Sequence, residues 1–234
     1  MHRVFIKGDL HGEIEELERI ATLIPKPTKR DLLIVLGDFG VIFADEKTSF
    51  DNLLRVAKLP YTLAFVDGNH ENFDLIKKLE TSFSPWYGGE IGVLPWNIIH
   101  LKRGEIYEIN NRKIAVMGGA DSIDKFTRVE GISWWKEERI SDKDINNLVR
   151  NMNNKKINSV DFILTHDAPA HKIPEIALYS GINDFFGFSP SQQQLERVYS
   201  LLKFKKWYFG HWHMDNKIIS DNFECLFREV KRII

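Results

Sequence analysis

Five apolar segments rich in β-branched and aromatic residues each lead within one or two positions into a short polar motif. Segments of this composition predict buried strands. Parallel strands of an α/β sheet end at a common edge, and such sheets place their ligand sites there. We therefore expect the five motifs to gather at one edge of the fold. The segments and their motifs are 4–6 with GDLHG at 8–12, 32–36 with GDFG at 37–40, 63–66 with GNHE at 68–71, 162–164 with THD at 165–167, and 207–209 with GHWH at 210–213.

The spacing of the first three motifs predicts how their strands are connected. Asp9 and Asp38 are 29 residues apart, and Asp38 and Asn69 are 31 residues apart. A strand, a crossover helix and the next parallel strand occupy roughly 30 residues. The first 80 residues therefore predict two consecutive strand–helix–strand units and a mixed α/β fold.

Helical periodicity lies where these crossovers require it. After Gly12, apolar residues recur every three or four positions from Ile14 to Ile24, with glutamates on the opposite side. Pro25 marks the end of this helix. Further helices are predicted over about 48–58, over 72–79, and from Ser141 onward, where the sequence has a capping-box pattern.

The remaining sequence predicts short strands joined as meanders and hairpins, without further crossover units. Segment 84–96 mixes aromatic residues with glycine and proline and predicts a surface loop, and the polar run 151–156 predicts another. A length of 234 residues is ordinary for one α/β domain, so we expect 1–234 to form a single domain. The expected strands are 98–101, 106–109, 113–117, 217–220 and 223–227.

Nearly all residues that could bind a metal ion fall in the five motifs, including five of the eight histidines. Two residues that are two positions apart at a strand end share a face, which applies to Asp9 with His11 and to His211 with His213. The second carboxylate, Asp38, can bridge two ions with its two oxygens. The candidate ligands are Asp9, His11, Asp38, Asn69, His166, His211 and His213.

The chemistry of these ligands favours a particular class of metal site. Imidazole and carboxylate donors without a thiolate suit manganese, iron or zinc better than calcium or an iron–sulfur cluster. Seven ligands are too many for one tetrahedral zinc and suit a pair of ions that keep positions open for water. A pair about 3.5–4 Å apart can activate a bridging water and stabilise an in-line displacement at phosphorus. The ligand set therefore favours phosphoester hydrolysis.

Each motif alone also has an ordinary structural explanation. A Gly-Asp pair such as Gly37-Asp38 is typical of a turn, and His70-Glu71 could cap a helix. The Asp-Phe-Gly at 38–40 resembles a kinase magnesium loop, but no glycine-rich strand-turn or His-Arg-Asp loop accompanies it. The joint occurrence of all five motifs favours the metal site.

Taken together and in this order, the motifs resemble those of the calcineurin-like metallophosphoesterases. The pattern of that superfamily appears here as GDLHG, GDFG, GNHE, THDAP and GHWH, and it spans most of the chain, from Gly8 to His213. Five ordered motifs are far more specific than any one of them. The resemblance implies a four-layer αββα sandwich, in which two mixed β-sheets are flanked by helices and the metals lie at one end.

The resemblance also implies roles for individual residues. His70 would be free of metal and placed to donate a proton to the leaving oxygen or to stabilise charge on the phosphoryl group. One ion would be held by Asp9, His11, Asp38 and His213, and the other by Asp38, Asn69, His166 and His211.

One departure from the pattern concerns phosphate binding. The protein-phosphatase branch has an arginine soon after the second motif, whereas here Asp38 is followed by Phe39 and Gly40 and no arginine is near. Another basic residue must then meet the phosphate, because guanidinium groups pair well with phosphate oxygens. Arg128 and Arg139 are the candidates. Phosphodiesters and nucleotides remain open as substrates.

Composition restricts the partners. The chain carries 32 basic and 33 acidic side chains, a net charge of −1, which gives no electrostatic footprint for extended nucleic acid. The aromatic pair Trp134-Trp135 could stack a nucleobase or anchor a loop. No segment has the length of a membrane span and no signal peptide is evident, so we expect a cytoplasmic protein. The lone Cys225 excludes an internal disulfide and predicts a small buried side chain.

The sequence thus predicts a dinuclear-metal-dependent phosphoester hydrolase, a phosphomonoesterase or a phosphodiesterase, in which a metal-activated hydroxide attacks phosphorus. Two divalent ions are expected, manganese first, with iron, zinc or nickel as alternatives. The expected partner is a phosphoester, with nucleotides among the candidates. The alternative functions are a metal-dependent nuclease and a non-catalytic scaffold of the same fold. Against the scaffold, no ligand of the set is missing.

Overall fold

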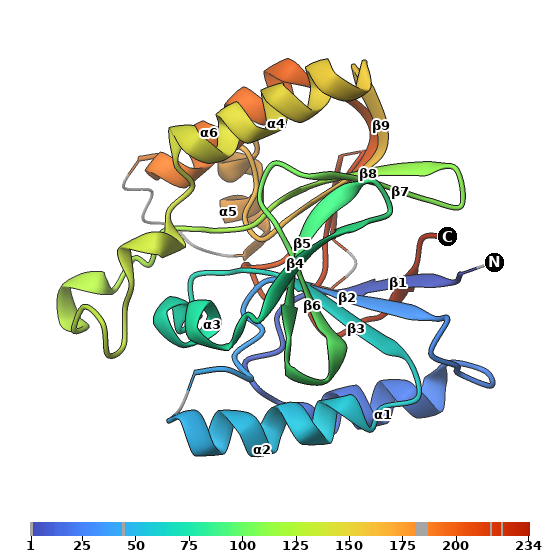
Figure 1. Cartoon of the computed structure of the whole chain (residues 1–234). Helices are drawn as coiled ribbons and strands as arrows, with labels where there is room; N and C mark the ends of the chain where they lie inside the picture. The colour runs from blue at the N-terminus through green and yellow to red at the C-terminus, as the bar shows by residue number, and fades with distance from the viewer. Residues whose placement is uncertain (1, 44, 181–186, 216, 221) are drawn as a thin grey trace.

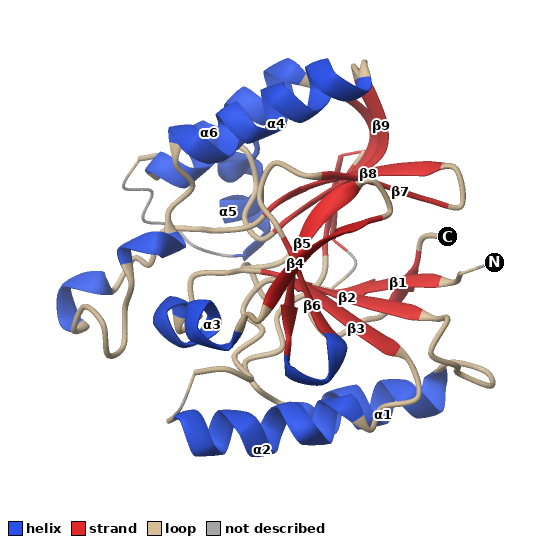
Figure 2. Ribbon diagram, in the orientation of Figure 1, coloured by secondary structure: helices blue, strands red, loops and turns tan. Residues whose placement is uncertain are grey.

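The computed structural model describes residues 2–43, 45–180, 187–215, 217–220 and 222–234. Two mixed β-sheets pack face to face at the centre, and helices cover both outer faces (Figure 1; Figure 2). The expected α/β fold with the layers helix, sheet, sheet, helix is confirmed.

The first sheet has seven strands in the order β13-β1-β2-β3-β6-β5-β4. Strands β1, β2 and β3 are parallel and are connected by α1 and α2, which confirms the two predicted crossover units. The strands are β1 (Val4–Lys7), β2 (Leu32–Leu36), β3 (Thr62–Val66), β4 (Ser82–Trp86), β5 (Gly89–Leu94), β6 (Ile98–Leu101) and β13 (Lys231–Arg232); the helices beside them are α1 (Ile14–Leu23), α2 (Glu46–Ala57) and α3 (Phe73–Leu79).

The second sheet has six strands in the order β11-β12-β10-β9-β8-β7. Its strands β8, β9, β10 and β12 are parallel neighbours, and β7 and β11 pair antiparallel at its two edges. The strands are β7 (Ile106–Ile109), β8 (Arg112–Met117), β9 (Ser159–Thr165), β10 (Lys203–Phe209), β11 (Lys217–Ser220) and β12 (Phe223–Cys225); the helices are α4 (Asp142–Lys155), α5 (Ile173–Ser180) and α6 (Pro190–Leu201). Short 3₁₀ helices occur at Pro95–Asn97, Lys125–Thr127, Lys136–Glu138 and Ala170–Lys172.

Three hydrophobic clusters separate the four layers. Buried side chains of the first three helices pack on the outer face of the first sheet, as the periodicity of α1 predicts. A second cluster fills the space between the sheets, and a third lies between the second sheet and helices α4, α5 and α6. Representative members are Leu17, Leu53 and Phe65 for the first, Ile6, Val66 and Leu164 for the second, and Leu148, Leu195 and Trp207 for the third.

The prediction of a loop at 84–96 was wrong. This segment contributes β4 and β5, which pair as an antiparallel hairpin with Trp86 opposite Gly89. Pro85 is tolerated because β4 is the edge strand of the sheet, where a missing backbone N–H need not break a hydrogen bond between strands. The hairpin continues antiparallel into β6, and β6 pairs parallel to β3. The expectation that no further crossover units follow was also wrong, because α4 connects the parallel strands β8 and β9.

The prediction of a loop at 151–156 was also wrong, because α4 continues to Lys155. Its asparagines hydrogen-bond to the segment before β7: Asn147 Nδ2 donates to the Arg103 carbonyl and Asn151 Nδ2 to the Gly104 carbonyl. These tertiary contacts stabilise a helix end whose composition alone favours a turn. The capping box at Ser141 is present as predicted.

Among the helices of the described residues, none combines the length with the apolar character that crossing a bilayer requires. Cys225 is a free, buried thiol, as expected.

Candidate active site

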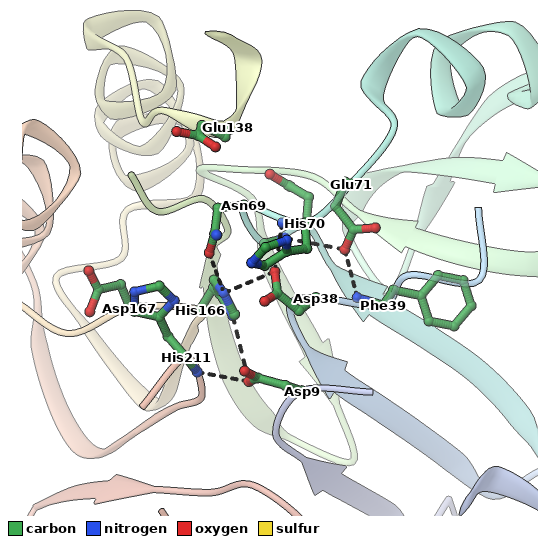
Figure 3. Close-up of polar contacts among 12 residues, drawn as sticks. Asp9, Asp38, Phe39, Asn69, His70, Glu71, Glu138, His166, Asp167 and His211 are labelled. Atoms are coloured by element: carbon green, nitrogen blue, oxygen red, sulfur yellow. Dashed lines mark hydrogen bonds and ion pairs between the residues drawn. The ribbon is translucent and has the colours of Figure 1, made fainter. Parts of the chain in front are cut away.

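The five motifs meet at one end of the molecule, where strands from both sheets finish. Asp9 follows β1, Asp38 follows β2 and Asn69 follows β3, while His166 follows β9 and His211 follows β10. Figure 3 shows Asp9, Asp38, Asn69 and His166 pointing toward one another. The two stacked sheets therefore each contribute polar side chains to one cluster.

Four residues of this cluster have left-handed backbone conformations. The φ angles are 50° at His11, 46° at Asp38, 67° at His211 and 50° at His213. Non-glycine residues rarely adopt such angles, and the cost is of order 1–3 kcal/mol each. Strain of this kind persists where surrounding contacts impose it, and it concentrates at functional sites.

Asp9, His11 and His213 form the first group of donors close enough to share one ion. Asp9 Oδ2 is buried and makes no hydrogen bond, although His213 Nε2 lies 3.0 Å away and His11 Nε2 lies 3.6 Å away. The two imidazole Nε2 atoms are themselves 2.9 Å apart. One buried carboxylate oxygen and two imidazole nitrogens thus converge on a common point.

Asp9, Asp38 and His166 form the second group, and all three are buried. His166 Nδ1 donates to the Leu36 carbonyl at 2.8 Å, which leaves Nε2 as the nitrogen that faces the site. That Nε2 lies 3.2 Å from Asp38 Oδ1 and 3.1 Å from Asn69 Oδ1. The hydrogen bond to Leu36 fixes the tautomer that a metal ligand requires.

His211 stands beside this second group. Its backbone N–H donates to Asp9 Oδ1 at 2.8 Å, and its ring centroid lies 4.9 Å from that of His166. The His211 ring lines the same cavity as His11, Asp38 and Asn69. All seven ligands predicted from the sequence are therefore gathered at one place.

The carboxylates of the cluster are held in their ionised form. Although burial acts to raise the pKa of Asp9, the His11 and His213 imidazoles bring it well below its usual range. Burial also opposes the ionisation of Asp38, but the His166 charge and hydrogen bond lower the pKa of Asp38 to about 2. Burial likewise opposes the charge on His166, and Asp38 with Asp9 raises its pKa to about 10. A divalent ion would take the place of that His166 proton.

Two buried groups support Asn69 from behind. Asn69 Nδ2 donates to Ser122 Oγ at 3.1 Å, and Ser122 Oγ donates to Glu138 Oε2 at 2.7 Å. Glu138 also accepts from the Ser122 backbone N–H at 2.8 Å. The chain Glu138–Ser122–Asn69 turns the carboxamide oxygen of Asn69 toward His166. No short-range motif marked Ser122 or Glu138 in the sequence.

A further buried carboxyl, Glu71, braces the second motif. Glu71 Oε1 accepts from the Phe39 N–H at 2.7 Å, and Oε2 accepts from the Gly40 N–H at 3.3 Å. Burial first, and then the nearby Asp38 charge, raises the pKa of Glu71 to about 8. Glu71 therefore fixes the backbone that follows Asp38 and lies outside the two donor groups.

His70 lies at the mouth of the cluster and contacts Arg128. Its backbone N–H donates to Asp38 Oδ1 at 2.8 Å, and its Nδ1 lies 3.1 Å from Arg128 Nη1. A guanidinium can only donate, so Nδ1 of His70 accepts and its proton resides on Nε2. Burial lowers the pKa of His70; the Asp38 charge opposes this shift and the Arg128 charge adds to it.

The comparison with protein families decides what kind of protein has this site. A family model described as calcineurin-like phosphoesterase matches residues 2–215. The chain belongs to the calcineurin-like phosphoesterase family. It is therefore a metal-dependent phosphoesterase, a hydrolase that acts on phosphoester substrates.

Solved structures similar to this phosphoesterase share little of its sequence. A protein of unknown function from Aquifex aeolicus is 15% identical with a TM-score of 0.37, over 87% of this chain and 88% of that one. A phosphopantetheinyl hydrolase from Mycobacterium tuberculosis is 14% identical with a TM-score of 0.44, over 97% of this chain and 88% of that one. No curated protein matched this chain.

The donors of this phosphoesterase fit divalent metal ions. A buried carboxylate oxygen without a hydrogen bond, beside two imidazole nitrogens, is the arrangement that an ion would complete. The whole set consists of carboxylate, carboxamide and imidazole donors, which suits first-row divalent ions.

The two candidate phosphate-binding arginines are placed differently. Arg128 lines the same cavity as five of the candidate ligands, and Asp124 Oδ2 accepts from its Nη2 at 2.8 Å. Arg139 lines a different pocket and pairs with Asp121 Oδ1 at 2.7 Å. The structure thus brings Arg128, and not Arg139, to His70.

Of the aromatic pair in the same segment, Trp135 is buried and anchors the loop. Its Nε1 donates to Asp74 Oδ2 at 2.9 Å, and its ring packs edge-on against Phe43. Trp135 therefore holds the segment that carries Arg128 against α3.

Proposed function

We propose that this phosphoesterase is a dinuclear enzyme that holds two divalent ions, manganese first and iron, zinc or nickel as alternatives. The observation that carries the proposal is the carboxylate of Asp9, which belongs to both donor groups and has one buried oxygen without a hydrogen bond. A single carboxylate within reach of two separate sets of imidazoles suits two neighbouring ions.

The proposed ligands follow from these two groups. Asp9, His11, Asp38 and His213 would hold one ion, and Asp38, Asn69, His166 and His211 the other. The carboxylates of Asp9 and Asp38 are the groups able to bridge: His11 Nδ1 lies 3.9 Å from Asp38 Oδ2, so Asp38 faces both sets of imidazoles. When bound, the ions would activate a water for attack and neutralise charge on the phosphoryl oxygens.

The reaction is hydrolysis of one phosphoester bond. The oxygen of water forms a new bond to phosphorus, and the bond from phosphorus to the alcohol oxygen breaks. The departing alcohol oxygen gains a proton, and the attacking water loses one, so that protons balance over the whole reaction. We propose that His70 donates a hydrogen bond from Nε2 to the departing oxygen, in the tautomer that Arg128 selects. Arg128 would meet the phosphoryl oxygens with its guanidinium.

We also propose that residues 1–234 act as one domain. The ligands come from both sheets, and a shared hydrophobic cluster fills the space between the sheets. Neither half of the chain would keep a complete site by itself.

The test of His70 uses substrates that differ in their leaving group. The variant His70→Ala should lose about 10²–10⁴-fold in kcat on a phosphoester of a poor leaving group and much less on a p-nitrophenyl ester. The matched control is His171→Ala, which removes a histidine that pairs with Glu196 at the surface. Equal rates for wild type and His70→Ala on the poor leaving group would remove His70 from the mechanism.

A substrate survey tests the proposed activity itself. The purified chain is assayed with Mn²⁺, and again after chelation, against a monoester, a diester, a cyclic nucleotide and single-stranded DNA. Turnover of the monoester or the diester that disappears with the metal supports the proposal. Cleavage of DNA alone would favour the nuclease instead.

A further inference from the structure

A cavity of about 780 Å³ extends from the candidate ligands toward the segment 121–135 and helix α5. Five candidate ligands and Arg128 line this cavity. The lining also includes three apolar residues, the exposed Ile123 and the largely buried Ile173 and Ala177. In Figure 1 the segment around 121–135, drawn in yellow-green, projects from the body of the molecule next to α3. The cavity is larger than a phosphate group requires and takes a substituent as well.

The polar side chains that line the cavity beside Ile123 already have ion-pair or hydrogen-bond partners. The Asp121 carboxylate pairs with Arg139 and accepts from the Ser191 N–H, and the Asp124 carboxylate pairs with Arg128. The Ser122 hydroxyl is held between Glu138 and Asn69, as described above.

The same holds on the side of α6. The Gln192 Nε2 donates to Asp167 Oδ2 at 3.0 Å, and its Oε1 accepts from the Ser189 N–H at 2.9 Å. The Ser189 hydroxyl in turn accepts from the Gln192 N–H. A substrate hydroxyl in this part of the cavity would lose its hydrogen bonds to water. Because the lining groups described here already have partners, binding of such a hydroxyl would be unfavourable.

On the projecting segment, in contrast, several apolar side chains are exposed among the described residues. Ile123 is 94% exposed, Phe126 is 89% exposed and Ile132 is 71% exposed. Val129 is 56% exposed and completes a series with a spacing of three residues. Single exposed apolar residues are ordinary, but four in one short segment beside a catalytic cavity point to a function in binding.

We propose that the substrates of this enzyme are phosphoesters that carry an apolar alkyl or aryl group, and that Ile123, Ile173 and Ala177 bind this group. The inference rests on the proposed function, because it places the phosphoryl group at the ligands and at Arg128. Charge complementarity sets the position of the phosphoryl end of the substrate, since this anionic group faces a guanidinium and the metal site. The other end of the cavity is continuous with it and offers apolar contacts, so the occupant has one anionic and one apolar end.

The experiment varies the retained group and keeps the leaving group constant. The substrates are p-nitrophenyl phosphodiesters whose second ester group is methyl, hexyl, phenyl or thymidine 5′, assayed with the Mn²⁺-loaded wild-type enzyme. Because p-nitrophenolate departs in every case, differences in kcat/KM report binding of the second group. The hexyl and phenyl esters should exceed the methyl and thymidine esters by about tenfold or more in kcat/KM.

Variants of Ile123 test whether this residue causes the preference for the hexyl ester. Ile123→Ser should remove most of the preference for hexyl over methyl, and Ile123→Leu should keep it, since the exposed position tolerates both side chains in the fold. The matched control is Leu23→Ser on α1, which removes an exposed leucine outside the cavity. The control Leu23→Ser should keep the preference for hexyl and hydrolyse the methyl ester within about twofold of the wild type.

Binding without turnover gives a second readout. Hexylphosphonate has a carbon–phosphorus bond in place of the ester bond, so it cannot be hydrolysed in the same way. Calorimetric titration should show that it binds more tightly than methylphosphonate, with a more negative heat-capacity change. Ile123→Ser should abolish this difference.

The outcomes separate the two proposals. If the wild-type enzyme with Mn²⁺ hydrolyses neither these diesters nor p-nitrophenyl phosphate, the proposed function fails. If it hydrolyses p-nitrophenyl phosphate and none of the diesters, the function stands and the apolar substrate class is overturned. If it hydrolyses them all with equal kcat/KM, or prefers the thymidine ester, the function stands and the apolar substrate class is overturned. A preference for hexyl that survives in Ile123→Ser would also overturn the assigned binding residue.

Discussion

At the scale of single residues, the site depends on how a few side chains are fixed. Asp9 has an oxygen that nothing in the described residues satisfies by a hydrogen bond, and His166 has one nitrogen tied to the Leu36 carbonyl. Both features make sense when the facing atoms are metal ligands. A third candidate ligand, Asn69, is held by a residue outside the motifs, because its carboxamide donates to Ser122 Oγ.

Ser122 gives a direct test of that support. Ser122→Ala removes the hydroxyl that joins Asn69 to Glu138, so the Asn69 carboxamide loses its orientation. Loss of such a supporting contact typically weakens metal affinity by about 10–100-fold. Competition with a chromogenic chelator measures the Mn²⁺ affinity. Ser200→Ala on the outer helix α6 is the control, and an unchanged affinity in Ser122→Ala would show that Asn69 needs no such support.

Asp31 provides a prediction about pH. The hydrogen bond from Arg3 is the main cause that lowers the pKa of Asp31 to about 2, with burial acting against it. A carboxyl whose pKa is lowered by folding stabilises the protein above its unfolded pKa and loses that contribution as pH falls through the folded pKa. The contribution should therefore disappear between about pH 4 and pH 2.

Urea denaturation at pH 6, 4 and 3 checks the prediction. The free energy of unfolding of the wild type should fall by about 1–2 kcal/mol more than that of Asp31→Asn across this range, after allowance for solvent screening. Asp51→Asn, an exposed position on α2, is the control. Parallel curves for wild type and Asp31→Asn would contradict the assigned ion pair.

The motif residues could be predicted from the sequence, but Ser122 and Glu138, which hold Asn69 in place, could not. The motifs follow strands directly, so their spacing places Asp9 and Asp38 at one sheet edge. Ser122 and Glu138 are 16 residues apart in irregular structure, where no periodicity indicates that they meet. The choice between Arg128 and Arg139 was likewise open, because the path of the segment around them depends on tertiary contacts such as that of Trp135 with Asp74.

At the scale of elements, the ends of the strands pack so closely that only glycine fits at some positions. A Cβ on Gly8, just after β1, would lie 1.9 Å from the backbone oxygen of Leu226, just after β12. Backbone atoms cannot move aside as the end of a side chain can. The turn after β1 carries Asp9, so this contact also sets where the first ligand lies.

The variant Gly8→Ala tests this packing. We expect it to lower the free energy of unfolding by about 1–3 kcal/mol or more, as overpacking does, and to weaken Mn²⁺ binding. In the control Gly92→Ala, the new methyl group would meet the ends of the Glu80 and Lys102 side chains and no backbone atom of another segment. Chemical denaturation measures both variants. Equal stability of Gly8→Ala and wild type would mean that the two segments are not held as closely as described.

Element prediction succeeded where a single local pattern dominates and failed where tertiary context decides. The strand β2 and the amphipathic helix α1 follow from periodicity alone. The hairpin of β4 and β5 could not be predicted in this way, since Pro85 argues against a strand unless its position at the sheet edge is known. Helix α6 does have local signals, a Ser189 capping box followed by Pro190, that could have found it.

At the scale of the whole molecule, two sheets with separate outer cores share one inner core and one site. The first sheet contributes Asp9, His11, Asp38 and Asn69, and the second contributes His166, His211 and His213. A metal bound by these residues would therefore stabilise the contact between the sheets as well as the site. The resemblance of the motifs predicted this architecture, whereas composition and periodicity alone supported only mixed α/β structure.

The most direct test of the account is the metal content of catalytically active protein. After dialysis against Mn²⁺ and removal of free metal, elemental analysis should find about two ions per chain in the wild type. Asp38→Ala should lose both the bound metal and the turnover, and chelation should abolish activity that Mn²⁺ then restores. A wild-type chain that turns over phosphoesters at its full rate with no bound metal would contradict the claim that these side chains form a metal site.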